Sequence, residues 1–373
     1  MFNDRLDLGV VEFLKCDERI KTGTWIMRKL KVAILGVTGA VGREFLKLLE
    51  ERKFPIGALR LLASGRSAGK KIRFMGKAYE VEEAKAGSFK GLDLVFSSAG
   101  GAVSREFAPS IVKSGALMVD NTSAFRMDSE VPLVVPEINP EDIAKHQGII
   151  ANPNCSTIIM VVPLFPIHKA AGIKRVAVAT YQAASGAGAK AMEELKTQAQ
   201  DFLAGKKVTP KVLPHPIAFN VFSHNSKIGP DGYCEEETKM VKETKKIFHD
   251  PGIRVTATCV RVPVLRAHSE ALFIETKKKI SVEEVRALLS KASGVKVIDD
   301  REKNYFPMPI EATGQDAILV GRLREDPTVA NGLTMFVSGD QIRKGAALNA
   351  IQIAELAFEI SGQRSAVSGQ GKP

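Results

Sequence analysis

One cysteine stands where a helix is expected to begin. Cys155 follows Asn154 in the segment Asn-Pro-Asn-Cys-Ser-Thr, directly before an apolar run at 158–164. This order predicts Asn154 as the N-cap and places Cys155 in the first helical turn. A helix N-terminus favours negative charge and lowers the pKa of a thiol, so we expect Cys155 to be nucleophilic. The alternative is a small buried apolar side chain, which is the interpretation we give to the other three cysteines.

A glycine-rich turn near the start of the chain predicts a dinucleotide site. The segment Gly-Val-Thr-Gly-Ala-Val-Gly at 36–42 follows a predicted strand and precedes an amphipathic stretch. In that context the glycines allow a tight turn and close approach of a pyrophosphate to free N–H groups at a helix N-terminus. The residues expected to contact the cofactor are Gly36, Thr38, Gly39, Ala40, Val41 and Gly42.

The loop after the second predicted strand favours NADP over NAD. An NAD site usually places a carboxylate here, whereas this loop contains Ser64, Arg66 and Ser67 and no acidic residue. A guanidinium can bind the 2′-phosphate through two parallel hydrogen bonds. The competing interpretation is an ordinary glycine-rich surface turn.

The histidines indicate proton transfer rather than metal binding. Histidine is the side chain best suited to proton transfer near neutral pH. No HxH or HExxH spacing occurs among the six histidines, so we predict no metal site and expect most of them to be surface or packing residues.

The first half of the chain alternates predicted strands with helices. This pattern is typical of a parallel sheet covered on both faces, here a Rossmann-type nucleotide-binding domain of the α/β class. The expected strands are 31–35, 59–63, 93–97, 117–120 and 133–135, and the expected helices end near 52 or span 102–114.

After about residue 153 longer strands mix with helices, which predicts a second, α+β domain for catalysis and dimerisation. Its expected strands are 174–180, 254–263 and 271–276, its helices 190–203 and 235–248, and 209–226 is expected to be a long loop. The role of this domain in catalysis and dimerisation is implied only by the family resemblance given below. We expect a leader at 1–26, a nucleotide domain at 27–152 and 338–362, a catalytic domain at 153–337 and a tail at 363–373. The last helix, near 345–360, should return to the nucleotide domain.

The composition argues against a nucleic-acid-binding protein and against a membrane-spanning one. The net charge is +11, but lysine and arginine are dispersed without interleaved aromatic residues, so nucleic-acid binding is not expected. The charge could instead steer small anions to the site. No apolar stretch is long enough to cross a membrane, and cysteines without a CxxC pair fit a reducing cytoplasm.

Five motifs give the sequence a specific resemblance over about residues 30–361. They are the glycine turn, the Asn-Pro-Asn-Cys segment, Tyr-Gln-Ala-Ala-Ser-Gly at 181–186, the segment from Arg261 to His268 and Arg-Lys-Gly-Ala-Ala at 343–347. In type and order they resemble the bacterial aspartate-semialdehyde dehydrogenases.

The resemblance implies a role for each matching residue. Cys155 is the implied nucleophile, His268 the general acid/base, and Gln182 the residue that orients the acyl group. Arg261 is implied to bind the substrate carboxylate and Glu236 its ammonium group, although an acidic first turn also suits a helix dipole. The phosphate is implied to contact Arg126, Lys239 and Asn154, and the nicotinamide portion Ser185, Gly186 and Gln341.

The activity implied is reduction of β-aspartyl phosphate by NADPH to L-aspartate-4-semialdehyde and phosphate, through a thioester on Cys155, in biosynthesis of the aspartate-family amino acids and diaminopimelate. The resemblance also implies a homodimer or a dimer of dimers. Two alternatives stay open: a reductase acting on N-acetyl-glutamyl phosphate, and a catalytically silent NADP-binding relative.

Overall fold

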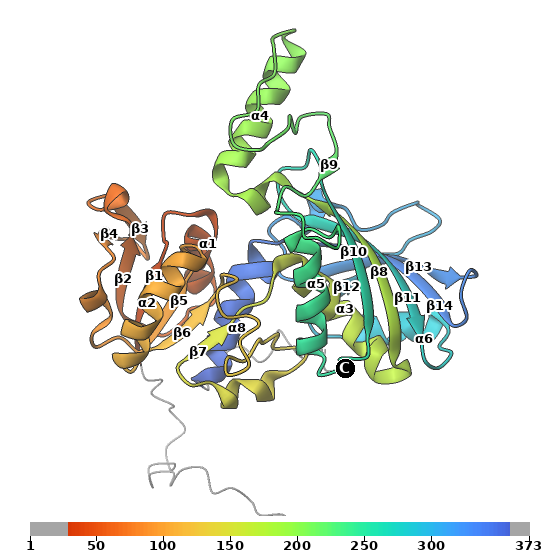
Figure 1. Ribbon diagram of the computed structural model, residues 1–373, viewed down its shortest axis with the longest axis horizontal. Coiled ribbons are helices and arrows are strands. Elements are labelled where there is room, and N and C mark those ends of the chain that lie inside the picture. Colours follow the sequence, from red (N-terminus) through yellow and green to blue (C-terminus); the bar gives the residue numbers. More distant parts are fainter. Residues whose placement is uncertain (1–28, 359–373) are drawn as a thin grey trace, which may run out of the picture.

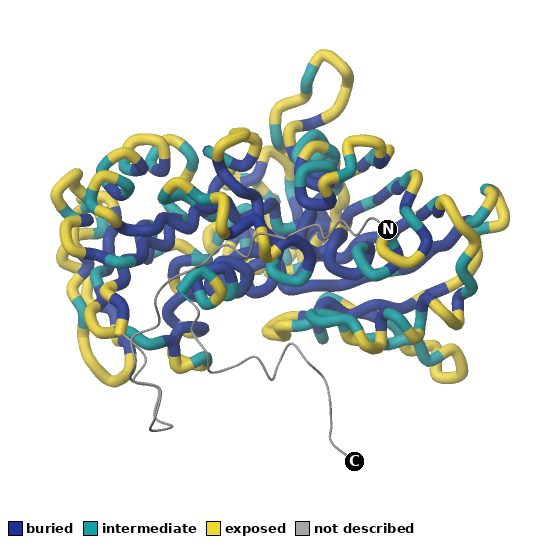
Figure 2. The backbone as a smooth tube through the Cα atoms, turned by 90° about the horizontal axis from the view of Figure 1, so that it is seen from below, coloured by how far each residue is buried: buried dark blue, intermediate teal, exposed yellow. Residues whose placement is uncertain are grey.

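The structure, a computed structural model, describes residues 29–358 (Figure 1). The expected leader and tail lie outside the described residues. Two sheets of seven strands each organise the chain. Figure 2 shows buried backbone running through the middle of the molecule and exposed backbone at the turns.

The first sheet has the order β3-β4-β2-β1-β5-β6-β7. All its pairs are parallel except β3 with β4. Its strands are β1 (Leu30–Leu35), β2 (Ile56–Ala63), β3 (Lys71–Phe74), β4 (Lys77–Glu83), β5 (Leu94–Ser97), β6 (Leu117–Asp120) and β7 (Ile149–Ala151). Its helical segments are α1 (Ala40–Glu51), η1 (Gly65–Ser67), η2 (Ala86–Phe89), α2 (Gly101–Lys113) and η3 (Pro140–Lys145).

Helices cover both faces of this sheet, as the alternating pattern predicts. One apolar cluster joins β1 to α1 and to α8 (Leu348–Ala357), and another joins the opposite face to α2. The strand order turns at β1, which lies between β2 and β5. In open parallel sheets a ligand binds at such a switch point, beyond the carboxyl ends of the strands.

Two features of the first sheet differ from the sequence-based expectation. The strand expected at 133–135 is wrong, because Leu133 makes only an isolated bridge to Ala151 and the edge strand is β7. The β3–β4 hairpin was not predicted. It turns at Met75 and Gly76, both with positive φ.

The second sheet is mixed, with the order β12-β13-β14-β11-β8-β10-β9. Its strands are β8 (Ile173–Gln182), β9 (Phe222–Ser223), β10 (Arg254–Arg261), β11 (His268–Thr276), β12 (Val295–Val297), β13 (Ile318–Asp326) and β14 (Gly332–Gly339). The helical segments are α3 (Cys155–Ala171), η4 (Ala184–Ala187), α4 (Ala189–Leu203), α5 (Glu235–Ile247), α6 (Val282–Lys291), α7 (Pro309–Ala312) and the π-helical turn η5 (Arg343–Ala347). The strand expected to reach residue 263 ends at Arg261, before Pro263, which has no N–H to pair.

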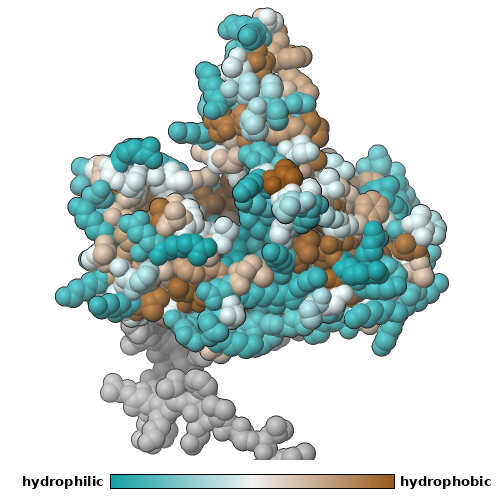
Figure 3. Space-filling view, in the orientation of Figure 1, coloured by the Kyte–Doolittle hydropathy of each residue, from teal (hydrophilic) through white to brown (hydrophobic). Residues whose placement is uncertain are grey.

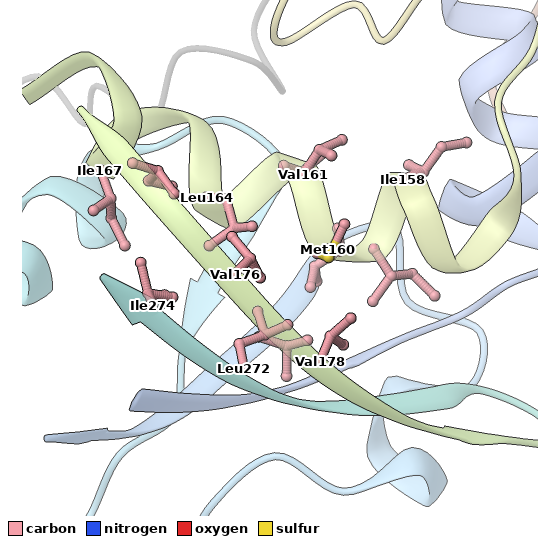
Figure 4. Close-up of a cluster of buried hydrophobic side chains, with 14 of the residues drawn as sticks. Ile158, Met160, Val161, Leu164, Ile167, Val176, Val178, Leu272 and Ile274 are labelled. Atoms are coloured by element: carbon pink, nitrogen blue, oxygen red, sulfur yellow. The ribbon is translucent and has the colours of Figure 1, made fainter. Parts of the chain in front are cut away.

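Helix α3 lies across one face of this sheet and forms its core. Met160, Leu164 and Ile167 pack against side chains of β8 and β11 (Figure 4). The helix is apolar on nearly every side because it is enclosed between the sheet and its neighbours. This packing fixes the position of its first residue, Cys155.

The opposite face of the second sheet is more open and carries aromatic side chains. Tyr181 is 39% exposed and Phe273 is 41% exposed. From Glu270 to Thr276 the burial pattern of β11 alternates, as expected for a sheet with only one covered face. Among residues 29–358, no helix is long and apolar enough to cross a membrane.

A protruding arm, residues 189–222, runs from α4 to β9 (Figure 1). Glu194 and Gln198 on α4 accept hydrogen bonds from backbone N–H groups of the following loop, which holds the loop in place. Apolar side chains lie on the arm's surface (Figure 3), among them Phe202 and Phe219.

Candidate active site

The predicted helix start at Cys155 is confirmed. Asn154 is the N-cap of α3, and its side-chain oxygen accepts the N–H groups of Ser156 at 3.0 Å and Thr157 at 3.2 Å. These bonds satisfy N–H groups that a helix start leaves without partners. They also fix Cys155 in the first turn of a mostly buried helix.

The expectation of a lowered thiol pKa is wrong for the site as it stands. Enclosure by protein raises the pKa of Cys155 to about 12, and the nearby Glu236 carboxylate acts in the same direction. The positive charges of Arg126 and Arg261 and the helix start lower the pKa by smaller amounts. Desolvation of a thiolate therefore outweighs the helix dipole here.

Glu236 is a buried carboxylate close to Cys155. Its Oε1 accepts the Asn154 side-chain amide at 2.8 Å and the Gln182 amide at 3.2 Å, and Lys239 lies 3.3 Å from Oε2. Burial opposes ionisation, but the charge of Lys239, these hydrogen bonds and, at low pH where His224 is protonated, the charge of that ring outweigh it and lower the pKa of Glu236 to about 2. A fixed negative charge therefore faces the site.

Gln182, at the end of β8, is oriented from two sides. Its amide nitrogen donates to Ser156 Oγ at 2.7 Å as well as to Glu236, and its Oε1 is buried without a hydrogen-bond partner among the described residues. The amide is thus held beside the start of α3 with its oxygen still able to accept a hydrogen bond.

Arg261 is buried at the end of β10 with its fork held by three partners. They are the Asn225 side chain at 3.3 Å, the Ala183 carbonyl at 3.3 Å and His224 Nε2 at 2.9 Å. Burial and the charge of Arg261 lower the pKa of His224 to about 4, so this ring is neutral and accepts from the guanidinium. Sequence analysis missed both loop residues; the only signal was polar side chains just before the acidic helix.

His268 begins β11 and is fully buried. Its Nδ1 accepts the Ala183 N–H at 3.0 Å, so the neutral ring carries its proton on Nε2. Nε2 has no partner among the described residues. Burial and the neighbouring Arg261 lower the pKa of His268 to about 3. The preceding Ala267 has a φ of 72°, a left-handed conformation that is strained for alanine.

Gly186 shows that His268 and Arg261 approach the same point. A Cβ atom on Gly186 would lie 2.9 Å from Arg261 Nη1 and 3.1 Å from His268 Nε2. Nearby, Gln341 contacts Ser185 Oγ and accepts the Ala267 N–H at 2.8 Å. Gln341 therefore connects the Ser185 turn to the turn that leads into His268.

Arg126 is buried between the two domains. Its guanidinium donates to the Asn152 carbonyl at 2.9 Å, the Asn121 carbonyl at 3.2 Å and Glu243 at 3.1 Å. Each Nη atom keeps one further N–H. Lys239 is half-exposed and also keeps donors beyond its bond to Glu236.

The glycine turn has the shape of a cofactor cradle. A Cβ on Gly42 would lie 2.3 Å from the Gly36 carbonyl oxygen, and Gly36 has a φ of 94°, so only glycine fits both positions. Thr38 lies in the turn, Gly39 is the N-cap of α1, and the first turn of α1 contains no acidic residue. An anion thus meets free N–H groups and no opposing charge.

The second cofactor loop forms η1 at the carboxyl end of β2. Ser64 and Arg66 are exposed there and lie beside the glycine turn's strand, β1. The structure also brings Glu83, at the end of β4, next to Gly65, where a Cβ would lie 2.6 Å from the Glu83 carboxylate. Sequence analysis missed this carboxylate because it comes from a strand that was not predicted.

Family models match both halves of the chain. Residues 31–146 match "Semialdehyde dehydrogenase, NAD binding domain", and residues 164–344 match "Semialdehyde dehydrogenase, dimerisation domain". A dinucleotide-binding sheet joined to a mixed sheet, with a thiol at the start of the helix between them, thus defines the class of semialdehyde dehydrogenases.

Individual relatives narrow this class. The chain is 59% identical to the aspartate-semialdehyde dehydrogenase of Synechocystis, across 88% of this chain and 98% of that protein. A crystal structure of aspartate semialdehyde dehydrogenase II from Vibrio cholerae, complexed with ASA, superposes with a TM-score of 0.87 at 44% identity and covers 90% of this chain and 100% of that one. The Candida albicans enzyme with NADP has a TM-score of 0.70 at 27% identity, over 89% and 100%. The chain belongs to the aspartate-semialdehyde dehydrogenase family.

Proposed function

We propose that this protein reduces β-aspartyl phosphate to L-aspartate-4-semialdehyde, with NADPH as hydride donor and a thioester on Cys155 as intermediate. The observation that carries the proposal is the buried group of Glu236, Arg261 and His268 around the start of α3. These side chains match the ammonium, the carboxylate and the carbonyl oxygen of a small amino-acid substrate.

Recognition of the substrate would rest on paired charges. The fork of Arg261, held by His224 and Asn225, suits the α-carboxylate. The ionised Glu236 suits the ammonium group, which favours an aspartyl substrate over one whose amine is acetylated. The remaining N–H donors of Arg126 and Lys239 would bind the phosphate.

Substrate binding would change the charges around the thiol. Glu236 is the second cause of the high Cys155 pKa, and a substrate ammonium group beside it would offset that negative charge. The substrate carboxylate and phosphate would at the same time pair with Arg261 and Arg126, the two positive charges that lower the Cys155 pKa.

In the biosynthetic direction, Cys155 sulfur attacks the acyl carbon, the bond to phosphate breaks, and the thiol proton leaves with the departing phosphate. When bound, NADPH supplies the hydride that reduces the thioester. His268 Nε2–H donates a hydrogen bond to the carbonyl oxygen as negative charge develops there, and it can give that oxygen a proton that returns to Nε2 when the carbon–sulfur bond breaks. Gln182 holds the acyl group, and the carbon–sulfur bond breaks to release the semialdehyde.

The cofactor assignment follows from the cradle at Gly36 to Gly42 and the loop with Ser64, Arg66 and Ser67. We propose that the loop binds the 2′-phosphate of NADP and that Ser185 and Gly186 approach the nicotinamide. The active protein is proposed to be a cytoplasmic homodimer that pairs through the open face of the second sheet, within the segment that matches the family's dimerisation domain.

The deciding experiment is phosphate-dependent reduction of NADP by L-aspartate-4-semialdehyde, followed as NADPH absorbance. Cys155→Ala should fold and bind NADP but lose turnover by about a thousandfold or more, the scale on which loss of a covalent nucleophile acts. Parallel assays with N-acetyl-glutamate semialdehyde test the alternative substrate. Activity of the Cys155→Ala variant near the wild-type level would contradict the covalent route.

A further inference from the structure

The two carboxylate oxygens of Glu243 accept hydrogen bonds from two different loops of the active site. Oε1 accepts from Arg126 Nη1 at 3.1 Å, and Oε2 accepts the backbone N–H of Asn154 at 2.7 Å. Arg126 follows β6 and Asn154 follows β7, whereas Glu243 comes from α5 of the other half of the chain. One side chain therefore joins Arg126 to the turn that carries the nucleophile.

The placement of Glu243 on α5 makes this connection rigid. Glu243 lies two turns after Glu236, on the same face of the helix, and the two carboxylates hold the backbone and the side chain of Asn154. One turn further, Lys246 donates to the carbonyls of Arg126, Asp128 and Val131. A single helix face thus fixes both loops.

Burial makes the pairing of Glu243 and Arg126 costly to disrupt. The side chain of Glu243 is 1% exposed and that of Arg126 is 8% exposed. Without its partner, the buried guanidinium would carry an uncompensated charge and would have to move. In the paired arrangement each Nη atom still keeps one N–H for an anion.

We propose that Glu243 is a positioning residue for the phosphate-dependent step. It holds the Arg126 side chain at a fixed position relative to the turn that carries Cys155. This inference rests on the proposed function. In the oxidative direction, the aldehyde is first oxidised to the thioester on Cys155 with release of NADPH, and phosphate then attacks the thioester carbon and releases the thiolate. Glu243 serves the second step through Arg126.

The substitution Glu243→Gln keeps the contact with Asn154 and removes the contact with Arg126. The glutamine oxygen can still accept the Asn154 N–H, whereas its amide nitrogen cannot accept from Arg126. We expect the KM for phosphate to rise about tenfold or more, while the rate of the NADPH burst without phosphate and the KM for NADP change by less than about twofold.

The matched control is Glu237→Gln on the same helix. Glu237 likewise uses both carboxylate oxygens, but both accept backbone N–H groups, those of Cys234 and Cys259, away from Arg126. Its KM for phosphate should equal that of the wild type. If Glu243→Gln does not fold, Glu243→Asp keeps the buried charge but is too short to span both partners, and the same rise in the phosphate KM is expected.

A double variant with Arg126→Gln tests the route of action. If Glu243 acts through Arg126, adding Glu243→Gln to that background changes the phosphate KM little further. The inference is overturned if Glu243→Gln slows the burst as much as turnover, or leaves the phosphate KM unchanged. A wild-type protein that gives no burst with the semialdehyde and NADP would overturn the proposed function, and this inference with it.

Discussion

Gly345 shows how closely the nucleophile is packed. A Cβ on this residue would lie 3.0 Å from Cys155 Cβ and 3.4 Å from Cys155 Cα. Gly345→Ala should therefore displace the thiol and lower kcat by about a hundredfold, the cost of a misplacement near 1 Å. NADP binding should persist. Gly87→Ala, at a site with open space, is the control, and steady-state kinetics with both substrates make the comparison.

The lowered pKa of His224 makes the free energy of unfolding depend on pH. Burial and Arg261 lower its pKa to about 4, from an unfolded value of about 6.5. Between these values the unfolded chain binds the extra proton, so the free energy of unfolding falls as the pH falls from about 6.5 to 4. His268 continues this loss to about pH 3, and Glu236 adds its own below about pH 4.5.

The check is urea unfolding of the wild type and of His224→Gln across this range. The variant should show a flatter decline in the free energy of unfolding between pH 6.5 and 4. An unchanged slope would mean that His224 is protonated equally in both states. Neutral His224 also accepts from Arg261, so the variant's KM for the semialdehyde is an independent measure of the same contact.

Sequence patterns located the residues of the site better than their partners. The N-cap at Asn154 and the helix start at Cys155 were predicted correctly because an N-cap followed by an apolar run is a local signal. The hydrogen bonds from Arg126 to Glu243 and from Arg261 to His224 join residues that only the fold brings together. No spacing of residues in the sequence predicts these contacts. The sign of the Cys155 pKa shift failed for the same reason, since enclosure depends on elements distant in sequence.

At the scale of elements, a buried ion network joins α1 to the turn before His268. Glu44 on α1 pairs with Arg266 at 3.0 Å and with Arg343 at 3.3 Å, and Arg266 also binds Asp340. Since the start of α1 forms the cofactor cradle and Arg266 lies two residues before His268, this network sets the cofactor site relative to the histidine.

Glu44→Gln should lower the free energy of unfolding by about 3 kcal/mol, because two arginines, one of them buried, lose a charged partner. The KM for NADP should rise as α1 loosens. Chemical denaturation measures the first effect and kinetics the second. Glu50→Gln, an exposed site on the same helix, should change neither; equal effects in both variants would contradict a specific role for the network.

The elements themselves followed the sequence where periodicity was strong. The alternation of the first half predicted a parallel sheet with two covered faces, and α1, α2, α4 and α5 begin or end within one residue of the expected bounds. Short edge elements were the weak point. β3 and β7 have only four and three residues, which is too few for a pattern to stand out, and β4, which pairs with β3, has a single buried residue, Val81.

At the scale of the whole molecule, we expect the open face of the second sheet to form the dimer interface. Tyr181 and Phe273 are exposed there, and exposed aromatic patches of this kind mark interaction surfaces. Phe273→Glu should convert a dimer to monomers, because a charge would be buried in an apolar interface. Sedimentation velocity checks the change, with Met75→Glu on the β3–β4 turn as a control. A dimeric Phe273→Glu protein would exclude this face.

The return of α8 to the first sheet has a consequence for how the protein is made. Ile351, Ile353 and Ala354 fill the same apolar cluster as strands from the first hundred residues. A ribosome releases this helix last, so the cofactor-binding half stays unfinished while the other half is synthesised and can already collapse around α3. The nascent chain therefore keeps an apolar face of the first sheet uncovered until residues 348–357 have left the ribosome.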